Sequence, residues 1–265
     1  MQIVGYDSGV GHLRSDPIKG VEGEVNPPAL LIAEDGNLRR EALGRGHELA
    51  YALGERHCAG THDKTVHEPC PNSGAPYCDA HTTPWPCARC SGDCEKPIDA
   101  CDEEHAVYLA AFAPDRFKVG VTRSWRLHAR LREQGADRAA HLRTVSDGRI
   151  ARRIERGLAA SVPDRIPIEW KIRGLDRSVD GAAWRDLLAE DEPVATYEFD
   201  HGLDLRERPM AETLAAGTVL GSQGRLLVLE RGGSTYAVDL RDLVGHEIES
   251  GGTDRELQAS LGAFG

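Results

Sequence analysis

The feature that most constrains this chain is a run of cysteines and histidines between positions 58 and 101. All seven cysteines of the 265 residues lie there. A stretch with so few apolar side chains cannot order itself around a core, so a bound metal ion would supply its folding energy. The N-terminus has neither the basic start nor the apolar core of a secretion signal, and we expect a cytoplasmic protein. In reducing cytosol, clustered cysteines more often hold metal than form disulfides.

Four thiols lie within fifteen positions at the end of this run. Cys87-Ala-Arg-Cys90 is a Cys-x-x-Cys turn, which lets both sulfurs face one tetrahedral ion, and Cys94 and Cys101 follow it. Four thiolates make a closed ligand set, which is typical of structural zinc. We therefore predict that these four cysteines bind Zn²⁺, with disulfides as the weaker interpretation.

A second ligand set precedes the first and is less regular. The preferred quartet is Cys58, His62, Cys78 and His81. Its members come in pairs four and three positions apart, which is ligand spacing, and Cys70 or His67 are the substitutes. The alternative is a group of solvated histidines beside a buried thiol. One or two structural zinc ions are expected, and catalytic zinc is disfavoured because four protein ligands close the coordination sphere.

The charge of the chain is unevenly distributed. The formal net charge is -11, yet between Arg116 and Arg156 there are twelve Lys or Arg residues against four Asp or Glu. Such a basic segment indicates contact with phosphate, although basic side chains on one helical face are as often simply solvated. The cations expected to contact nucleic acid are Lys118, Arg123, Arg126, Arg152 and Arg153. No apolar run approaches the roughly 18 residues of a membrane span, so no membrane association is expected.

Hydrophobic periodicity predicts an α+β protein with four regions. Residues 1–57 form a β-rich N-terminal region, 58–104 the zinc knuckle, 105–192 a small α/β module and 193–265 a β-rich C-terminal region. In the module, two apolar runs flank the Pro114-Asp115 turn and predict a hairpin, and a helix, a strand and a second helix follow. The predicted order is therefore ββαβα.

The two ends of the chain resemble each other. The stretch Ala29 to Leu49 parallels Arg225 to Ile248, and Gly46-His47-Glu48 returns as Gly245-His246-Glu247. This pattern suggests an internal repeat whose β units pack together, although a match this short also arises by chance.

Residues 58 to 134 resemble a prokaryotic family of unknown function, domain of unknown function 2797. The resemblance depends on the paired cysteine turns, on a Val107-Tyr108-Leu109 strand and on a Lys118-Val119-Gly120 strand. The glycine-turn region from Gly217 to Ile248 resembles the C-terminal part of that family. The resemblance implies no established activity.

The middle module further resembles the GIY-YIG nuclease superfamily. Tyr108 matches the tyrosine of its first triplet, Gly120 the glycine of its second, and Arg130 and Glu155 its arginine and glutamate. The resemblance implies that Glu155 holds Mg²⁺ or Mn²⁺, Arg130 offsets developing charge and Tyr108 relays a proton from the attacking water. Lys118 departs from the pattern, because the superfamily has a second tyrosine there.

Each of these residues also has a purely structural interpretation. Tyr108 on a buried strand would be a packed core aromatic, and Arg126 with Arg130 would form a solvated helical face. Glu155 would pair with Arg152 one helical turn away.

Together these observations lead us to expect a zinc-stabilised protein that binds RNA or DNA. Metal-dependent phosphodiester cleavage through Tyr108, Arg130 and Glu155 is the enzymatic version of this hypothesis. The alternative is a non-catalytic zinc-containing adaptor that docks on a nucleoprotein complex such as the ribosome. The acidic remainder of the chain favours the adaptor, because it would repel phosphate everywhere except at the basic segment.

Overall fold

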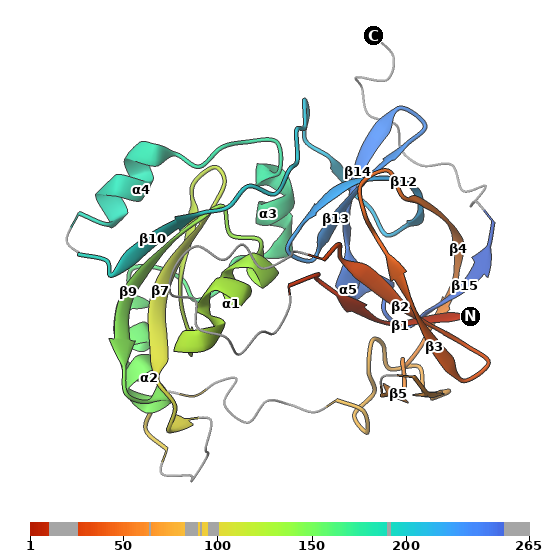
Figure 1. The fold of residues 1–265 in the computed structure, drawn as a ribbon, viewed down its shortest axis with the longest axis horizontal. Helices are drawn as coiled ribbons and strands as arrows, with labels where there is room; N and C mark the ends of the chain where they lie inside the picture. Colours follow the sequence, from red (N-terminus) through yellow and green to blue (C-terminus); the bar gives the residue numbers. More distant parts are fainter. Residues whose placement is uncertain are drawn as a thin grey trace. The chain divides into compact units, whose positions relative to one another are not determined.

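The protein divides into two compact units (Figure 1). The computed structural model describes residues 1–10, 26–63, 65–82, 90, 92–94, 101–189 and 192–251. The first unit contains the described residues of 1–10, 26–82 and 202–251, and the second those of 90–201. The regions expected at the two ends of the chain, 1–57 and 193–265, thus both contribute to the first unit, although residues 193–201 belong to the second. Both units combine strands with helices, and strands predominate over the described residues taken together, which confirms the mixed, strand-rich class.

The first unit is built on a nine-stranded sheet with the order β11-β14-β13-β12-β4-β15-β1-β2-β3. Its strands are β1 (Gln2–Asp7), β2 (Ala29–Glu34), β3 (Asn37–Ala42), β4 (Glu48–Arg56), β11 (Met210–Ala211), β12 (Ala215–Gln223), β13 (Leu226–Arg231), β14 (Ser234–Asp239) and β15 (His246–Ser250). The short helix α5 (Leu240–Leu243) joins β14 to β15. Every neighbouring pair is antiparallel except β11 with β14.

This sheet contains the same four-stranded unit twice. Strands β1-β2-β3 and β12-β13-β14 are consecutive antiparallel meanders, and the register shifts at Gly5 opposite Leu31 in one and at Gly221 opposite Val228 in the other. Both shifts are β-bulges at the same place in the motif. The sequence match between the two ends of the chain corresponds to these two halves.

The fourth strand of each half is exchanged with the other half. β4 follows β3 in the chain but pairs with β12, through Glu48 opposite Thr218, and β15 follows β14 but pairs with β1, through Glu247 opposite Gln2. The two exchanged strands pair with each other where Tyr51 lies opposite Ser250. The exchange ties the N-terminal and C-terminal halves into one sheet.

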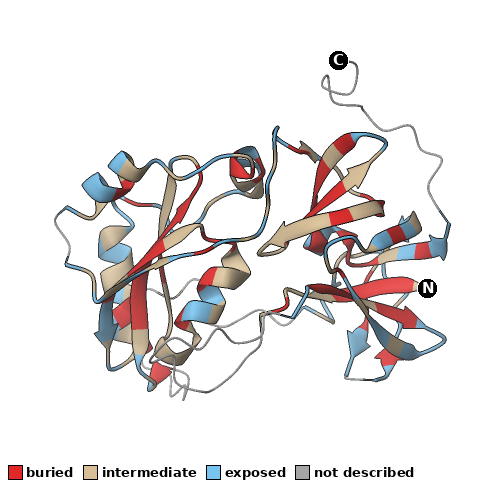
Figure 2. Ribbon diagram, turned by 45° about the horizontal axis from the view of Figure 1, so that its top comes forward, coloured by how far each residue is buried: buried red, intermediate tan, exposed pale blue. Residues whose placement is uncertain are grey.

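The core of the first unit repeats in the same way. Leu30 and Ile32 on β2 are fully buried, as are Leu227 and Leu229 on β13, and all four belong to one apolar cluster. Side chains two positions apart on a strand share a face, so each half contributes one apolar row. In Figure 2 the buried residues follow the strands of each unit.

The second unit is built on a four-stranded antiparallel sheet with the order β10-β9-β7-β8. Its strands are β7 (His105–Phe112), β8 (Arg116–Arg123), β9 (Arg138–Val145) and β10 (Ala195–Glu198). Its helices are the 3₁₀ turn η2 (Ser124–Arg126), α1 (Leu127–Gln134), α2 (Gly148–Leu158), α3 (Ile168–Gly174) and α4 (Gly181–Leu187). From β7 to α2 the order is two strands, a helix, a strand and a helix, which is the ββαβα order expected from the sequence.

Helices pack on both faces of this sheet. Along β7, Tyr108 and Phe112 belong to a cluster with Leu131 of α1, whereas Val107 faces the opposite cluster with Ala151 of α2. The pairing of β7 with β8 sets Tyr108 opposite Gly120, Ala110 opposite Lys118 and Phe112 opposite Arg116. Lys118 and Arg116 therefore lie on the α1 face of the edge strand β8, together with Tyr108.

Two local signals fix the helix ends in this unit. Asp147 caps α2, because its side chain accepts hydrogen bonds from the N–H groups of Arg149 and Ile150. Gly135 ends α1 in the left-handed conformation, with φ of 68°. No helix in the described part of the chain is long and apolar enough to cross a membrane.

Candidate metal centre and candidate active site

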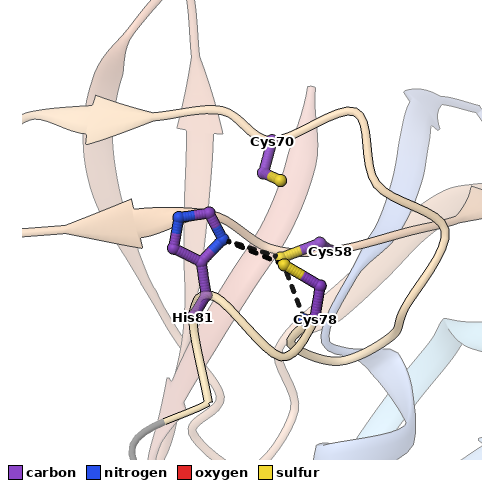
Figure 3. Close-up of side chains that lie close together, drawn as sticks. All are labelled: Cys58, Cys70, Cys78 and His81. Atoms are coloured by element: carbon purple, nitrogen blue, oxygen red, sulfur yellow. Dashed lines mark hydrogen bonds between the residues drawn. The ribbon is translucent and has the colours of Figure 1, made fainter.

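Three thiols and one imidazole converge in the first unit, in the loop that follows β4 (Figure 3). The ligand atoms of Cys58, Cys70, Cys78 and His81 all lie within 4.8 Å of one another. His81 Nδ1 lies 3.2 Å from Cys58 Sγ and 3.4 Å from Cys78 Sγ. Around a tetrahedral zinc ion, bond lengths near 2.3 Å to sulfur and 2.0 Å to nitrogen place a sulfur and a nitrogen about 3.5 Å apart. The four residues could therefore hold a metal ion such as zinc.

Backbone hydrogen bonds bring the loop back onto the end of β4. The N–H of Cys58 donates to the carbonyl of Asn72, and the N–H of Ala59 to that of Pro76. His57 Nδ1 lies 3.0 Å from the carbonyl oxygen of Cys70, which also fixes this cysteine. The ligands are thus positioned by the main chain of the loop as well as by the ion they would bind.

The electrostatics of the cluster also suit a cation. Burial by itself raises the pKa of Cys58, but N–H groups of Cys78 and Gly60 donate to its sulfur and the pKa is lowered overall. For Cys70 the backbone N–H of Asn72 lowers the pKa, whereas burial and the neighbouring thiols Cys58 and Cys78 raise it overall. Neighbouring thiols resist simultaneous ionisation, and a bound cation removes that resistance.

Two histidines of the run lie outside this group. His62 belongs to the small sheet of β5 (Thr61–His62) and β6 (His67–Glu68), where it is exposed and lies opposite His67. His67 is buried, and its Nε2 lies 2.8 Å from the carbonyl oxygen of Ala59. Cys70, the substitute considered from the sequence, stands where His62 was expected.

The later cysteine set belongs to the second unit, and Cys87 lies outside the described residues. The other members are Cys90 and Cys94, which are half-buried, and Cys101, which is buried. Their segment is attached to α2, since Arg149 Nε donates to the carbonyl of Cys94 at 2.9 Å. Cys90 Sγ accepts a hydrogen bond from the N–H of Gly92 at 3.3 Å. Binding of zinc by this set stays a prediction.

A second group of functional side chains lies on the α1 face of the second unit's sheet. The hydroxyl of Tyr108 lies directly over Gly120, because a Cβ at position 120 would be 2.5 Å from it. Gln134 at the end of α1 donates to this hydroxyl at 2.7 Å. Burial raises the pKa of Tyr108, Arg130 opposes that rise and Glu155 adds to it. Tyr108 is therefore buried, and the charges of Arg130 and Glu155 both act on its hydroxyl.

The charges of Arg130 and Glu155 also act on Lys118. Burial lowers its pKa to about 8, Arg130 contributes to this shift, and Glu155 and Asp164 oppose it. The partners of Lys118 come from α1, from α2 and from the loop before α3, so side chains from several elements act on one ammonium group.

Arg130 and Glu155 differ in exposure. The Arg130 side chain is 46% exposed and its guanidinium lies 3.3 Å from Glu133. The Glu155 carboxylate is only 12% exposed and accepts a hydrogen bond of 2.7 Å from Arg152. The ion pair with Arg152 expected on structural grounds is thus present, beside the lysine and the tyrosine.

The other expected cations are divided between neighbouring elements. Arg126 pairs with Glu133 at 2.8 Å, and Arg123 lies 3.6 Å from Glu103. Arg153 is exposed on α2. Gln134 is a site residue to which the sequence gave no role, although it lies in the stretch that carries the family resemblance. Its contact with Tyr108 spans 26 positions.

Comparison with known proteins gives one match. The family model described as "Protein of unknown function (DUF2797)" matches residues 46–248, from just before β4 to β15. No curated protein and no solved structure matches.

Proposed function

The chain belongs to the DUF2797 family of proteins of unknown function, and we propose that it is a zinc-stabilised nucleic-acid-binding protein. In this proposal Tyr108, Lys118, Arg130 and Glu155 bind one phosphodiester of RNA or DNA. Cleavage of that phosphodiester with Mg²⁺ or Mn²⁺ is the reaction that the group would perform, as the likeness to the GIY-YIG superfamily implies.

The observation that carries the proposal is the mutual influence of these four residues. Arg130 and Glu155 both act on the ionisation of Tyr108 and of Lys118, although the residues come from four elements. A buried phenol, an ammonium group, a guanidinium and a carboxylate thus influence one another at the edge strand β8, although α1 and α2 pack on opposite faces of the sheet. Strongly perturbed ionisable groups of this kind are enriched at functional sites.

Each residue has a chemical role in this proposal. Glu155 would bind the divalent ion, and Arg130 would offset the charge that develops on the phosphate. The hydroxyl of Tyr108 accepts from Gln134, so its own proton is directed elsewhere and can be exchanged with an attacking water. Lys118 replaces the second tyrosine of the GIY-YIG pattern, and with a pKa of about 8 it is mostly protonated at pH 7 and would bind a phosphate oxygen.

Zinc would have a structural role in the first unit. Three thiolates and one imidazole close a tetrahedral coordination sphere, which leaves no position for substrate. The loop between Arg56 and Thr82 contains only two-residue strands. The ion would therefore fix the path of this loop, and a second zinc is proposed for the later cysteine set.

Cleavage assays with matched glutamate variants test the enzymatic proposal. Labelled single-stranded and double-stranded RNA and DNA are incubated with Mg²⁺ or Mn²⁺ and wild-type protein, Glu155→Gln or Glu198→Gln. Glu198 is an exposed glutamate on β10 and serves as the control. We expect cleavage by wild type and the control, and binding without cleavage by Glu155→Gln. If wild type binds but does not cut, the group is only a phosphate-binding site.

The adaptor hypothesis remains the second candidate because of the charge balance. The net charge of -11 repels naked nucleic acid outside the basic segment, and Arg126 and Arg130 are already paired with Glu133. Absence of binding to naked RNA and DNA at low salt, combined with co-purification of a nucleoprotein complex, would favour the adaptor.

A further inference from the structure

An exposed tryptophan on α3 lies between two arginines. The guanidinium carbon of Arg116 is 3.9 Å from the centroid of the Trp170 ring, and that of Arg173 is 4.8 Å from the same centroid. Trp170 is 37% exposed, which is unusual for the largest aromatic side chain. Cation–π contacts of this kind fix guanidinium groups while their N–H edges remain available to another partner.

Neither arginine is neutralised by a network of acids. Asp115 lies 3.1 Å from Nε of Arg116 and offsets part of its charge, and both side chains are more than one-third exposed. Arg173 is exposed and has no ion-pair partner among the described residues. Two oriented and largely uncompensated cations at one place are a suitable site for phosphate.

The cluster of Trp170, Arg116 and Arg173 adjoins the candidate active site along strand β8. Arg116 and Lys118 are two positions apart on β8, so they share the α1 face and lie about 6.8 Å apart along the strand. Tyr108 lies over Gly120, the next position on that face. Lys171 of α3 donates to the carbonyl of Gln134, which shows that α3 packs beside the same face. Arg116, Lys118 and Gly120, with Tyr108 over it, therefore follow one another along β8, and Arg173 shares the Trp170 ring with Arg116.

We propose that Arg173, Arg116 and Lys118 form a track for one unpaired strand of nucleic acid, in which Trp170 holds the two guanidinium groups and successive phosphates lead to Tyr108. This inference rests on the nucleic-acid-binding function proposed above and names its substrate class. The row follows the edge strand of the sheet, which fits one backbone. The spacing of about 6.8 Å along β8 is about twice the 3.4 Å rise of a stacked nucleotide, so neighbouring phosphates reach Arg116 and Lys118 only when the strand is unstacked and extended, which an unpaired strand permits. The exposed part of the Trp170 ring can pack against a base.

Binding measurements with paired charge variants test the track. Fluorescence anisotropy is measured with labelled 12-nucleotide single strands of DNA and RNA, and with a duplex of the same sequence, over a series of salt concentrations. The test variant is Arg116→Gln with Arg173→Gln. The control is Arg143→Gln with Arg185→Gln, which removes two exposed arginines from β9 and α4. Trp170→Phe is a third variant, because it keeps a ring under the guanidinium groups.

We expect the test variant to bind single strands about tenfold more weakly at 0.1 M salt, and its salt slope to fall by about 1.4, because each lost phosphate contact on a single strand removes about 0.7. The control should lose less than twofold, and Trp170→Phe should lie between wild type and the test variant. Wild type should prefer the single strand to the duplex.

The outcomes separate this inference from the proposed function. If the test variant binds like wild type while Lys118→Gln binds weakly, the track is wrong and the phosphate site stands. Equal losses in the test variant and the control would show a general charge effect and would also refute the track. A preference for duplex would refute the single-strand assignment. If wild type binds no nucleic acid at all, the proposed function and the track fail together.

Discussion

Replacement of Lys118 by methionine should stabilise the second unit at neutral pH. The folded protein lowers the pKa of Lys118 from 10.5 to about 8, chiefly by burial. At about 1.36 kcal/mol per pKa unit, this shift corresponds to about 3 kcal/mol against the protonated form. Methionine has a similar length and no charge, so it should fill the same space without this cost. A residue that a fold holds at such a cost is better explained by binding than by packing.

The stabilisation by Lys118→Met should decrease as the pH rises. Because the pKa is lowered in the folded state, the cost is fully present below about pH 8 and fades as pH rises towards 10.5, where the unfolded chain also loses the proton. Linkage with these two pKa values gives an advantage for Lys118→Met of about 3 kcal/mol at pH 7 and about 1.4 kcal/mol at pH 9.5.

Urea unfolding followed by tryptophan fluorescence measures this effect in the right part of the protein. The three tryptophans among the described residues, at positions 125, 170 and 184, belong to the second unit. The buffers should contain no added divalent ion, since one bound at Glu155 would change the field at Lys118. Arg153→Met, an exposed site on α2, serves as the control and should show no such pH dependence. A variant less stable than wild type at pH 7, or a difference that stays constant between pH 7 and 9.5, would refute the reasoning.

Three further predictions concern the two sites. Cys70→Ser should lower zinc content, measured by mass spectrometry of the purified protein, whereas His62→Asn should leave it unchanged because His62 lies outside the cluster. Gly120→Ala should destabilise the second unit by about 1–3 kcal/mol in urea, because its Cβ would meet the hydroxyl of Tyr108. Gln134→Leu should cost about 1–3 kcal/mol in the same assay, since it removes the hydrogen bond that the buried hydroxyl of Tyr108 accepts from Gln134.

For each of these three predictions, one result would contradict the structure. If His62→Asn lost zinc while Cys70→Ser kept the wild-type zinc content, the quartet expected from spacing would be correct. An unchanged midpoint for Gly120→Ala would mean that Tyr108 does not lie over the glycine. Wild-type stability of Gln134→Leu would mean that the hydroxyl finds another partner.

The candidate metal ligands show what spacing predicts and what it does not. Cys58, Cys78 and His81 were expected from the sequence because pairs three or four positions apart commonly bind one ion. The choice between His62 and Cys70 depended on the path of the loop, which spacing does not contain. The pairing of Thr61 with Glu68 turns the chain back, so that Cys70 returns to Cys58 while His62 stays on the hairpin.

The second unit shows the same limit. The ββαβα order followed from apolar periodicity and turn residues, because these are local signals. The contacts of Gln134 with Tyr108 and of Arg116 with Trp170 span 26 and 54 positions, and only the packing of α1 and α3 against the sheet creates them. A single sequence gives no signal for such pairs.

The duplication in the first unit explains where the candidate sites lie in the chain. The two halves of the sheet end at Arg56 and at Ser250, and the segment between the first half and β11 contains the loop with the candidate metal ligands and the described residues of the second unit. Because β4 and β15 are exchanged and paired with each other, all nine strands come from the two ends of the chain, and the loop after β4 packs on them through Ala59, which is buried beside Val4 and Val244. The described residues proposed for zinc, phosphate and single-strand binding therefore form an insertion between two repeats. Substitutions there can alter function while the hydrogen bonds of the nine-stranded sheet stay intact.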